Sequence, residues 1–235
     1  MPSPALESLR RSVATLEGGG TDGHGPDLPL GLAGFEGMRT GVLHEISPAS
    51  PAAGHDGAAL GFAAFLLGGL ARLAAKPVLW LAEGDMPHAP GLARFGLGPD
   101  RLVMVVPGRS KAALWALEEA ARSPALAAVL GEVRGLDFTA ARRLQLAAGH
   151  SGTTLLLLNR AAAAVTPALT RWRVESLPGA EGHWRLDLLR CRGRSPDDSG
   201  MVASWKVEWD GTAHCLGLAA PAGHRPAVPE CARVA

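Results

Sequence analysis

Short apolar segments alternate with helical segments through the middle of this 235-residue chain. The apolar segments are continuous runs rich in Val, Leu and Ala, as is typical of parallel strands that are covered on both faces. Such alternation predicts βαβ crossovers and a doubly wound α/β sheet. The predicted strands are 42–46, 78–82, 102–106, 126–130 and 153–159, and the predicted helices are 58–74, 89–95, 111–122 and 139–148.

From residue 169 onward the pattern changes to a strict alternation of apolar and polar residues. Trp172 and Val174, for example, alternate with Arg171, Arg173 and Glu175. A period of two residues indicates half-buried antiparallel strands. We therefore expect an antiparallel β extension that continues the same sheet.

The composition divides the chain into four parts. Residues 18–28 are rich in Gly and polar residues, which indicates a linker, and the last segment is rich in Pro and Ala, which indicates a flexible tail. The expected parts are an N-terminal amphipathic helix at 1–17, the linker at 18–28, one α/β domain at 29–218 with its β extension at 169–218, and the tail at 219–235.

The N-terminal helix carries one apolar stripe. Leu6, Leu9, Val13 and Leu16 recur at helical spacing. A stripe of this kind needs a surface that buries it. We expect that surface either on the chain's own domain or on a neighbouring protein, and these four residues are our candidates for partner binding.

The predicted strand at 42–46 is followed by a small-residue loop and an apolar helix. Nucleotide-binding proteins use this order to direct backbone N–H groups at phosphate, with the loop sequence G-x-x-x-x-G-K-[ST]. The corresponding residues here are Ala49, Gly54, His55 and Asp56. His55, mostly neutral at pH 7, replaces the lysine, and Asp56 replaces the hydroxyl that holds Mg²⁺. A carboxylate beside a phosphate costs on the order of 1–4 kcal/mol per close pair, so we expect no ATP or Mg²⁺ cofactor and no enzyme activity.

Acidic residues follow two of the predicted strands. Glu83 follows 78–82, where a carboxylate orients the attacking water in an active ATPase. Without a phosphate-binding lysine, we interpret Glu83 as a solvated loop residue. Glu132 resembles the acid that holds Mg²⁺, but that acid normally ends its strand, and here Gly131 separates Glu132 from the predicted strand.

Histidines and arginines give weaker indications. His44 is interpreted as a packing or rim residue, and the eight histidines show no ligand spacing, so we expect no metal site. Arg190, Arg192 and Arg194 share one face of an extended segment and are candidates for contact with DNA phosphates. Residues 171–206 contain seven basic and five acidic side chains, an excess of two, so we favour a solvated, partly ion-paired face.

The overall charge and the cysteines set the expected environment. A net charge of +1 provides no global field toward nucleic acid or membrane, so we expect DNA contact to be mostly indirect. The longest apolar run, 57–71, is too short to span a membrane, and the N-terminus lacks the pattern of a secretion signal. Three scattered cysteines predict no disulfide framework and a cytoplasmic protein.

The order of these segments resembles the ImuA family, inducible mutagenesis proteins related to RecA and SulA. The resemblance implies a RecA-like P-loop NTPase fold with a mostly parallel central sheet, an N-terminal helix and a C-terminal antiparallel β extension. It also implies that Glu83 stands at the position of the catalytic glutamate and that Arg160 replaces the glutamine that senses the γ-phosphate. The resembling segments are 28–51, 77–85, 95–107, 116–133, 137–160 and 170–179.

This resemblance implies a role in the SOS response to DNA damage. We expect a RecA-like pseudo-ATPase adaptor in mutagenic translesion DNA synthesis. The implied partners are an ImuB-type relative of Y-family polymerases and an error-prone C-family DNA polymerase, with RecA as a further candidate. Two alternatives remain open: an atypical RecA/RadA-like ATPase that takes its lysine from Lys76 or Lys111, and a SulA-like inhibitor of cell division that binds a tubulin-like partner.

Overall fold

The computed structural model describes residues 25–50, 56–82, 84, 87–107, 110–132, 136–160, 166–179, 182–192 and 203–218. Several of the residues singled out in the sequence lie outside these ranges, and so does most of the proposed linker and the whole of the tail at 219–235. Of the residues singled out, those outside the described part are Leu6, Leu9, Val13, Leu16, Gly54, His55, Glu83 and Arg194.

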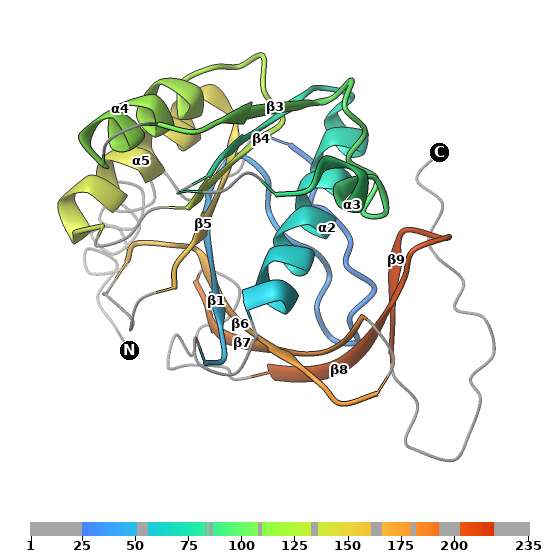
Figure 1. Cartoon of the computed structure of the whole chain (residues 1–235). Helices are drawn as coiled ribbons and strands as arrows, with labels where there is room; N and C mark the ends of the chain where they lie inside the picture. The colour runs from blue at the N-terminus through green and yellow to red at the C-terminus, as the bar shows by residue number, and fades with distance from the viewer. Residues whose placement is uncertain are drawn as a thin grey trace, which may run out of the picture.

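One nine-stranded sheet forms the framework of the molecule (Figure 1). Its strand order is β3-β2-β4-β5-β1-β6-β7-β8-β9. The first six strands in the chain pair in parallel, and β7, β8 and β9 add antiparallel pairings at one side. The strands are β1 (Leu43–Pro48), β2 (Val78–Leu81), β3 (Leu102–Val105), β4 (Ala128–Glu132), β5 (Thr154–Leu158), β6 (Thr170–Ser176), β7 (His183–Cys191), β8 (Ala203–Asp210) and β9 (Cys215–Leu218).

Helices cover both faces of the parallel strands (Figure 1). Helix α2 (Asp56–Ala74) lies on one face with the short α3 (Ala89–Ala93), and α4 (Ser110–Ala121) and α5 (Phe138–Ser151) lie on the other. Two separate clusters of buried side chains, one on each face, form the core. The α/β class and the mostly parallel sheet predicted from the sequence are therefore confirmed.

Helix α2 is apolar all round because every side of it is covered. Thirteen of its residues are buried, and Phe62 contacts Trp172 of β6 at 5.6 Å between ring centroids. Its length and composition alone would suit a membrane span, but 72% of its most apolar window is buried inside the domain. Gly68 permits a close approach, since a Cβ there would lie 2.1 Å from the Phe95 carbonyl oxygen. These features identify α2 as the central core helix.

The antiparallel strands curve around α2 and complete its enclosure (Figure 1). Their apolar residues face the helix, as with Trp184, Leu186 and Val207. On β7, Asp187 accepts hydrogen bonds from Arg173 and Ser204. Burial alone would raise the pKa of Asp187, but these bonds and the charges of Arg173 and Arg185 outweigh it and hold the pKa below its usual value.

Two details differ from the sequence-based expectations. Strand β4 begins at Ala128 and runs through Gly131 to Glu132, whereas the prediction ended at residue 130. Of the cysteines in the described part, Cys191 is not in a disulfide and Cys215 is disulfide-bonded, whereas the sequence predicted no disulfide framework.

His44 of β1 is completely buried, which agrees with its interpretation as a packing residue. Its Nδ1 is 2.7 Å from Thr170 Oγ1, and its Nε2 is 2.8 Å from the Arg39 carbonyl oxygen. Burial lowers the pKa of His44 to about 4, and it outweighs the hydrogen bond to Arg39, which acts in the opposite direction. The imidazole is therefore neutral in the folded protein at pH 7.

We predict that His44 makes folding acid-sensitive between pH 6.5 and 4. Over this range the unfolded chain binds a proton at His44 and the folded chain does not, so stability is complete above pH 6.5 and falls as the pH drops. The loss is about 2 kcal/mol by pH 5. Urea unfolding at pH 7 and pH 5 measures it. We expect His44→Gln to lose less stability between pH 7 and pH 5 than the wild type. His150→Gln, which changes an exposed histidine, should keep the wild-type dependence on pH. An unchanged dependence of stability on pH in His44→Gln would contradict the prediction.

Candidate functional site

The site predicted from the phosphate loop lies at the carboxyl edge of the parallel strands, between β1 and α2. Helix α2 begins at Asp56, so this carboxylate stands in the first helical turn, where the phosphate loop normally presents a hydroxyl. Ala49, at the start of the loop, donates its backbone N–H to the Val174 carbonyl at 2.8 Å. That bond continues the pairing of β1 with β6, so one backbone donor of the loop is already in use.

Glu132 corrects the interpretation based on the sequence. It is the last residue of β4, paired in register with Leu158 of β5, and Gly131 lies within the strand. Its side chain is only 7% exposed. Glu132 Oε1 accepts a hydrogen bond of 2.7 Å from Trp80 Nε1 of β2. The residue therefore does occupy the strand-ending position of the acid that holds Mg²⁺ in phosphate-loop ATPases.

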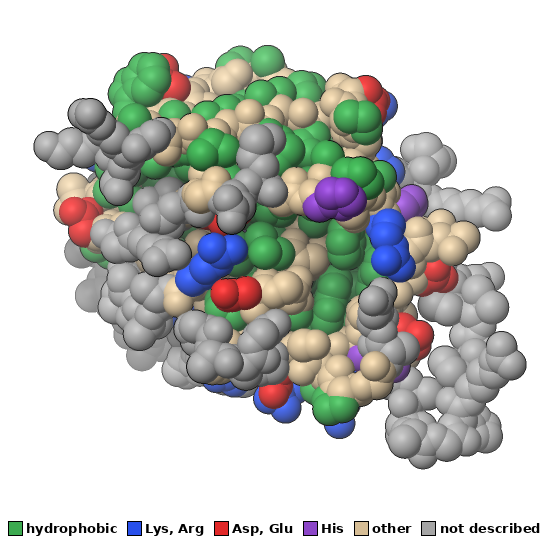
Figure 2. Space-filling model, in the orientation of Figure 1, with side chains coloured by type: hydrophobic (Ala, Val, Ile, Leu, Met, Phe, Trp, Pro, Cys, Tyr) green, Lys and Arg blue, Asp and Glu red, His purple; other side chains and the backbone are tan. Residues whose placement is uncertain are grey.

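Arg160 brings these two carboxylates together. Its Nη2 lies 3.2 Å from Glu132 Oε2, and its Nε lies 4.0 Å from Asp56 Oδ1. The Arg160 side chain is 24% exposed and that of Asp56 41%. Over the first turn of α2, Figure 2 shows basic and acidic side chains next to one another. The sequence indicated only that Arg160 replaces a glutamine, and the structure adds its two acidic neighbours.

The backbone at Arg160 is held by its neighbour Asn159. The Asn159 N–H donates to the Ile46 carbonyl at 2.8 Å, and its Nδ2 donates to Glu45 Oε1 at 2.9 Å. Glu45 is almost fully buried in β1 and also accepts hydrogen bonds from Arg171 and Thr166. Glu45 was not among the residues selected from the sequence, although a carboxylate inside an apolar strand is itself a signal of a buried polar network.

The side chains of Asp56, Glu132 and Arg160, which occupy the place of the nucleotide crevice of RecA-like ATPases, do not fit Mg²⁺ and a triphosphate. The space between the first turn of α2 and the end of β4 contains a guanidinium, and the two carboxylates beside it leave a net charge of −1 on the three groups. Among the buried side-chain atoms of the described residues, Asp56 Oδ1 and Arg160 Nε lack hydrogen-bond partners. Nor do the described residues contain a group of three His, Cys, Asp or Glu side chains placed to hold a metal ion.

The arginine-rich strands are largely ion-paired where the structure describes them. Arg171 contacts Glu45, Arg173 contacts Asp187 at 2.8 Å, and Arg185 contacts Glu175. Arg190 lies opposite Arg171 across the β6–β7 ladder and donates to the Thr166 carbonyl at 3.3 Å. Contact of Arg190, Arg192 and Arg194 with DNA phosphates stays a prediction.

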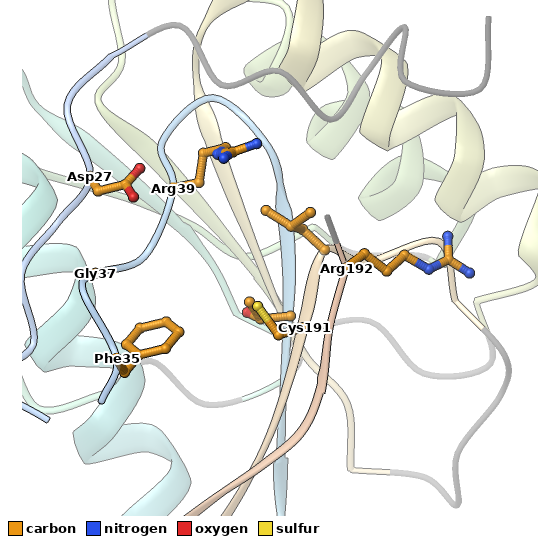
Figure 3. Close-up of a pocket in the computed structure, with 8 residues that line it drawn as sticks. Asp27, Phe35, Gly37, Arg39, Cys191 and Arg192 are labelled. Carbon is orange, nitrogen blue, oxygen red and sulfur yellow. The ribbon is translucent and has the colours of Figure 1, made fainter. Parts of the chain in front are cut away.

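Arg192 lines a cavity about as large as one water molecule, some 10 Å³, with Cys191, Asp27 and Arg39 among the other lining residues (Figure 3). In Figure 3 the Arg192 side chain extends away from Asp27 and Arg39. The cavity is too small for a ligand beyond water.

An exposed apolar surface on α4 and α5 was not foreseen. Trp115 of α4 is 66% exposed, and Phe138 and Leu146 of α5 are also exposed. A groove of about 610 Å³ lies at the C-terminal ends of these helices, lined in part by Leu146, Arg143 and His150. The sequence signal was available, since Trp115 interrupts the helical spacing of the buried residues of α4.

Comparison with known proteins places the chain in a family. No established family profile matches it. Protein ImuA from Caulobacter vibrioides, in strains NA1000 and CB15, is 31% identical over 216 residues, which cover 83% of this chain and 82% of that protein.

The KaiC-like protein PH0186 from Pyrococcus horikoshii OT3 shares the fold, with a TM-score of 0.55 and 12% identity over 84% of this chain and 100% of that one. This likeness identifies the RecA-like fold, and the similarity in sequence identifies the family. The chain belongs to the ImuA family.

Proposed function

We propose that this chain is a pseudo-ATPase adaptor that acts through protein contacts in SOS-induced mutagenic translesion DNA synthesis. The observation that carries the proposal is the carboxylate of Asp56 in the first turn of α2, in a crevice that already contains Glu132. Together with Arg160, the two carboxylates leave a net charge of −1 where an active ATPase holds Mg²⁺, and a triphosphate is repelled there; one close like-charge pair costs on the order of 1–4 kcal/mol. A RecA-like domain that does not bind nucleotide can still bind partner proteins through its surface, which is the role of an adaptor.

Membership of the ImuA family supports the choice of partners. We propose an ImuB-type relative of Y-family polymerases as the direct partner, an error-prone C-family polymerase in the same assembly, and RecA as a further partner. The stripe Leu6, Leu9, Val13 and Leu16 is the proposed contact, and DNA is reached mostly through the partners, in the cytoplasm.

The position of Lys76 argues against one of the two lysines on which the alternative of an atypical ATPase depends, the other being Lys111. Lys76 precedes β2, so it lies at the amino edge of the parallel strands, and its Nζ donates to the Pro124 carbonyl at 2.9 Å. The phosphate loop lies at the opposite, carboxyl edge. Lys76 therefore cannot supply the missing lysine without a large rearrangement.

We predict that the wild-type protein neither hydrolyses ATP nor binds it tightly, and that His55→Lys/Asp56→Ser binds ATP at least tenfold more tightly. The double change adds a cation and removes a like charge beside the phosphates, and one such pair accounts for about 1–4 kcal/mol. Titration with a fluorescent ATP analogue in the presence of Mg²⁺ measures the affinity. Asp100→Ser, which removes an exposed carboxylate elsewhere, serves as the control. Turnover by the wild type that is lost in Glu83→Gln would overturn the proposal.

We predict that Leu9→Asp abolishes binding to the purified ImuB-type partner, because it places a charge in the centre of the apolar stripe. Ala14→Asp adds the same charge outside the stripe and retains binding. Calorimetric titration of the partner into each full-length variant gives the affinities, and circular dichroism gives the melting temperatures. If Leu9→Asp instead unfolds the domain cooperatively, the stripe belongs to the chain's own core and the proposed contact is wrong.

A further inference from the structure

The guanidinium of Arg160 stands where a phosphate-loop ATPase holds its metal ion. In those enzymes Mg²⁺ is bound by the hydroxyl residue in the first turn of the loop's helix and by an acid at the end of a neighbouring strand. Here Asp56 and Glu132 occupy those two positions, and Arg160 contacts both, at 4.0 Å and 3.2 Å. The positive charge between these two acids is thus supplied by an arginine side chain in place of a metal ion.

Arg160 contacts its two acidic neighbours differently. Its distance to Glu132 is close to that of a hydrogen bond, whereas its contact with Asp56 is a longer ion pair. Glu132 is satisfied by Trp80 on one oxygen and by the Arg160 ion pair on the other. Toward Asp56, the buried atoms Asp56 Oδ1 and Arg160 Nε have no hydrogen-bond partner. Charge neutralisation therefore explains the position of Arg160 beside Asp56 better than hydrogen bonding does.

Arginine is suited to replace a metal at this point. Its guanidinium stays protonated at all physiological pH values and is tied to the backbone, so it cannot be exchanged or chelated. The adjacent Asn159 is fixed to β1 by a backbone bond to Ile46 and a side-chain bond to Glu45, which anchors the backbone next to Arg160. The cation is thus carried by an anchored backbone position just after β5, within reach of β4 and α2.

We propose that Arg160 is a built-in substitute for the divalent cation of the RecA-like crevice. It offsets one of the two negative charges of Asp56 and Glu132, connects the first turn of α2 to the end of β4, and makes the crevice independent of metal and nucleotide. The inference rests on the proposed function in one respect, since it accounts for how a pseudo-ATPase keeps the crevice folded without its ligand. Removing the guanidinium leaves two carboxylates that attract a divalent or trivalent cation.

Terbium luminescence tests this proposal, because Trp80 lies 2.7 Å from Glu132 and can sensitise Tb³⁺ bound there. The proteins to compare are the full-length wild type, Arg160→Gln, Arg160→Lys and Arg160→Gln/Glu132→Gln. We expect sensitised emission at micromolar Tb³⁺ from Arg160→Gln and at least a tenfold weaker response from the other three. The double variant shows that the emission arises at Glu132 and not near another tryptophan.

Thermal unfolding provides the second measurement. We expect Arg160→Gln to lower the melting temperature by about 5 °C or more, because it leaves Glu132 buried without its counter-charge. We expect Mg²⁺ or Mn²⁺ to restore part of the lost melting temperature in Arg160→Gln. In the wild type, these cations should change the melting temperature no more than NaCl of equal ionic strength does. Adding Glu132→Gln also recovers stability, because the buried charge itself is then gone. If Arg160→Gln does not fold, Glu132→Gln and Arg160→Lys still report whether stability depends on the pair.

Two outcomes would overturn the inference. One is Glu132-dependent Tb³⁺ emission from the wild type at the same concentrations as from Arg160→Gln. The other is an Arg160→Gln protein with unchanged stability and no response to cations. These failures differ from failure of the proposed function: a wild type that binds Tb³⁺ at Glu132 but does not hydrolyse ATP remains a pseudo-ATPase, whereas Glu83-dependent ATP turnover removes the proposed function itself.

Discussion

The enclosure of α2 determines how the rest of this domain is built. The helix has no polar side, so each of its faces needs an apolar neighbour. The parallel strands supply one, and the segment containing Leu28, Phe35 and Met38 supplies another. Trp172 of β6 and Trp184 of the antiparallel β7 close the remaining side. The β extension is therefore part of the core and not an appended module, since without it the helix would expose its apolar surface to water.

The position of α2 in turn determines the chemistry of the crevice. A phosphate loop places the first turn of its helix beside the end of a neighbouring strand, and the domain preserves that arrangement. Once a carboxylate occupies the first turn, it and the strand-ending acid repel each other unless a cation lies between them. Arg160 meets that requirement from the end of β5. The change at Asp56 and the change at Arg160 are thus two halves of one electrostatic arrangement.

The amino-acid pattern predicted most of the architecture and less of the site. Continuous apolar runs located β1 to β5 within one or two residues, because parallel strands covered on both faces leave that signal. Glu132 was misjudged since Gly131 resembles a strand end, although a glycine fits there beneath Leu117 of α4. The pairing of Arg160 with Glu132 could not be foreseen, because it depends on β4 and β5 being neighbours with Glu132 opposite Leu158. Strand order and register are properties of the assembled sheet, and local pattern does not contain them.

Gly68 allows α2 to pack closely against the backbone at Phe95. Because a Cβ at this position would lie 2.1 Å from the Phe95 carbonyl oxygen, any larger residue would force α2 or the segment at Phe95 to shift. The same helix begins twelve residues earlier, at Asp56. A shift of α2 caused by a side chain at residue 68 would therefore also change the distance between the Asp56 carboxylate and Arg160.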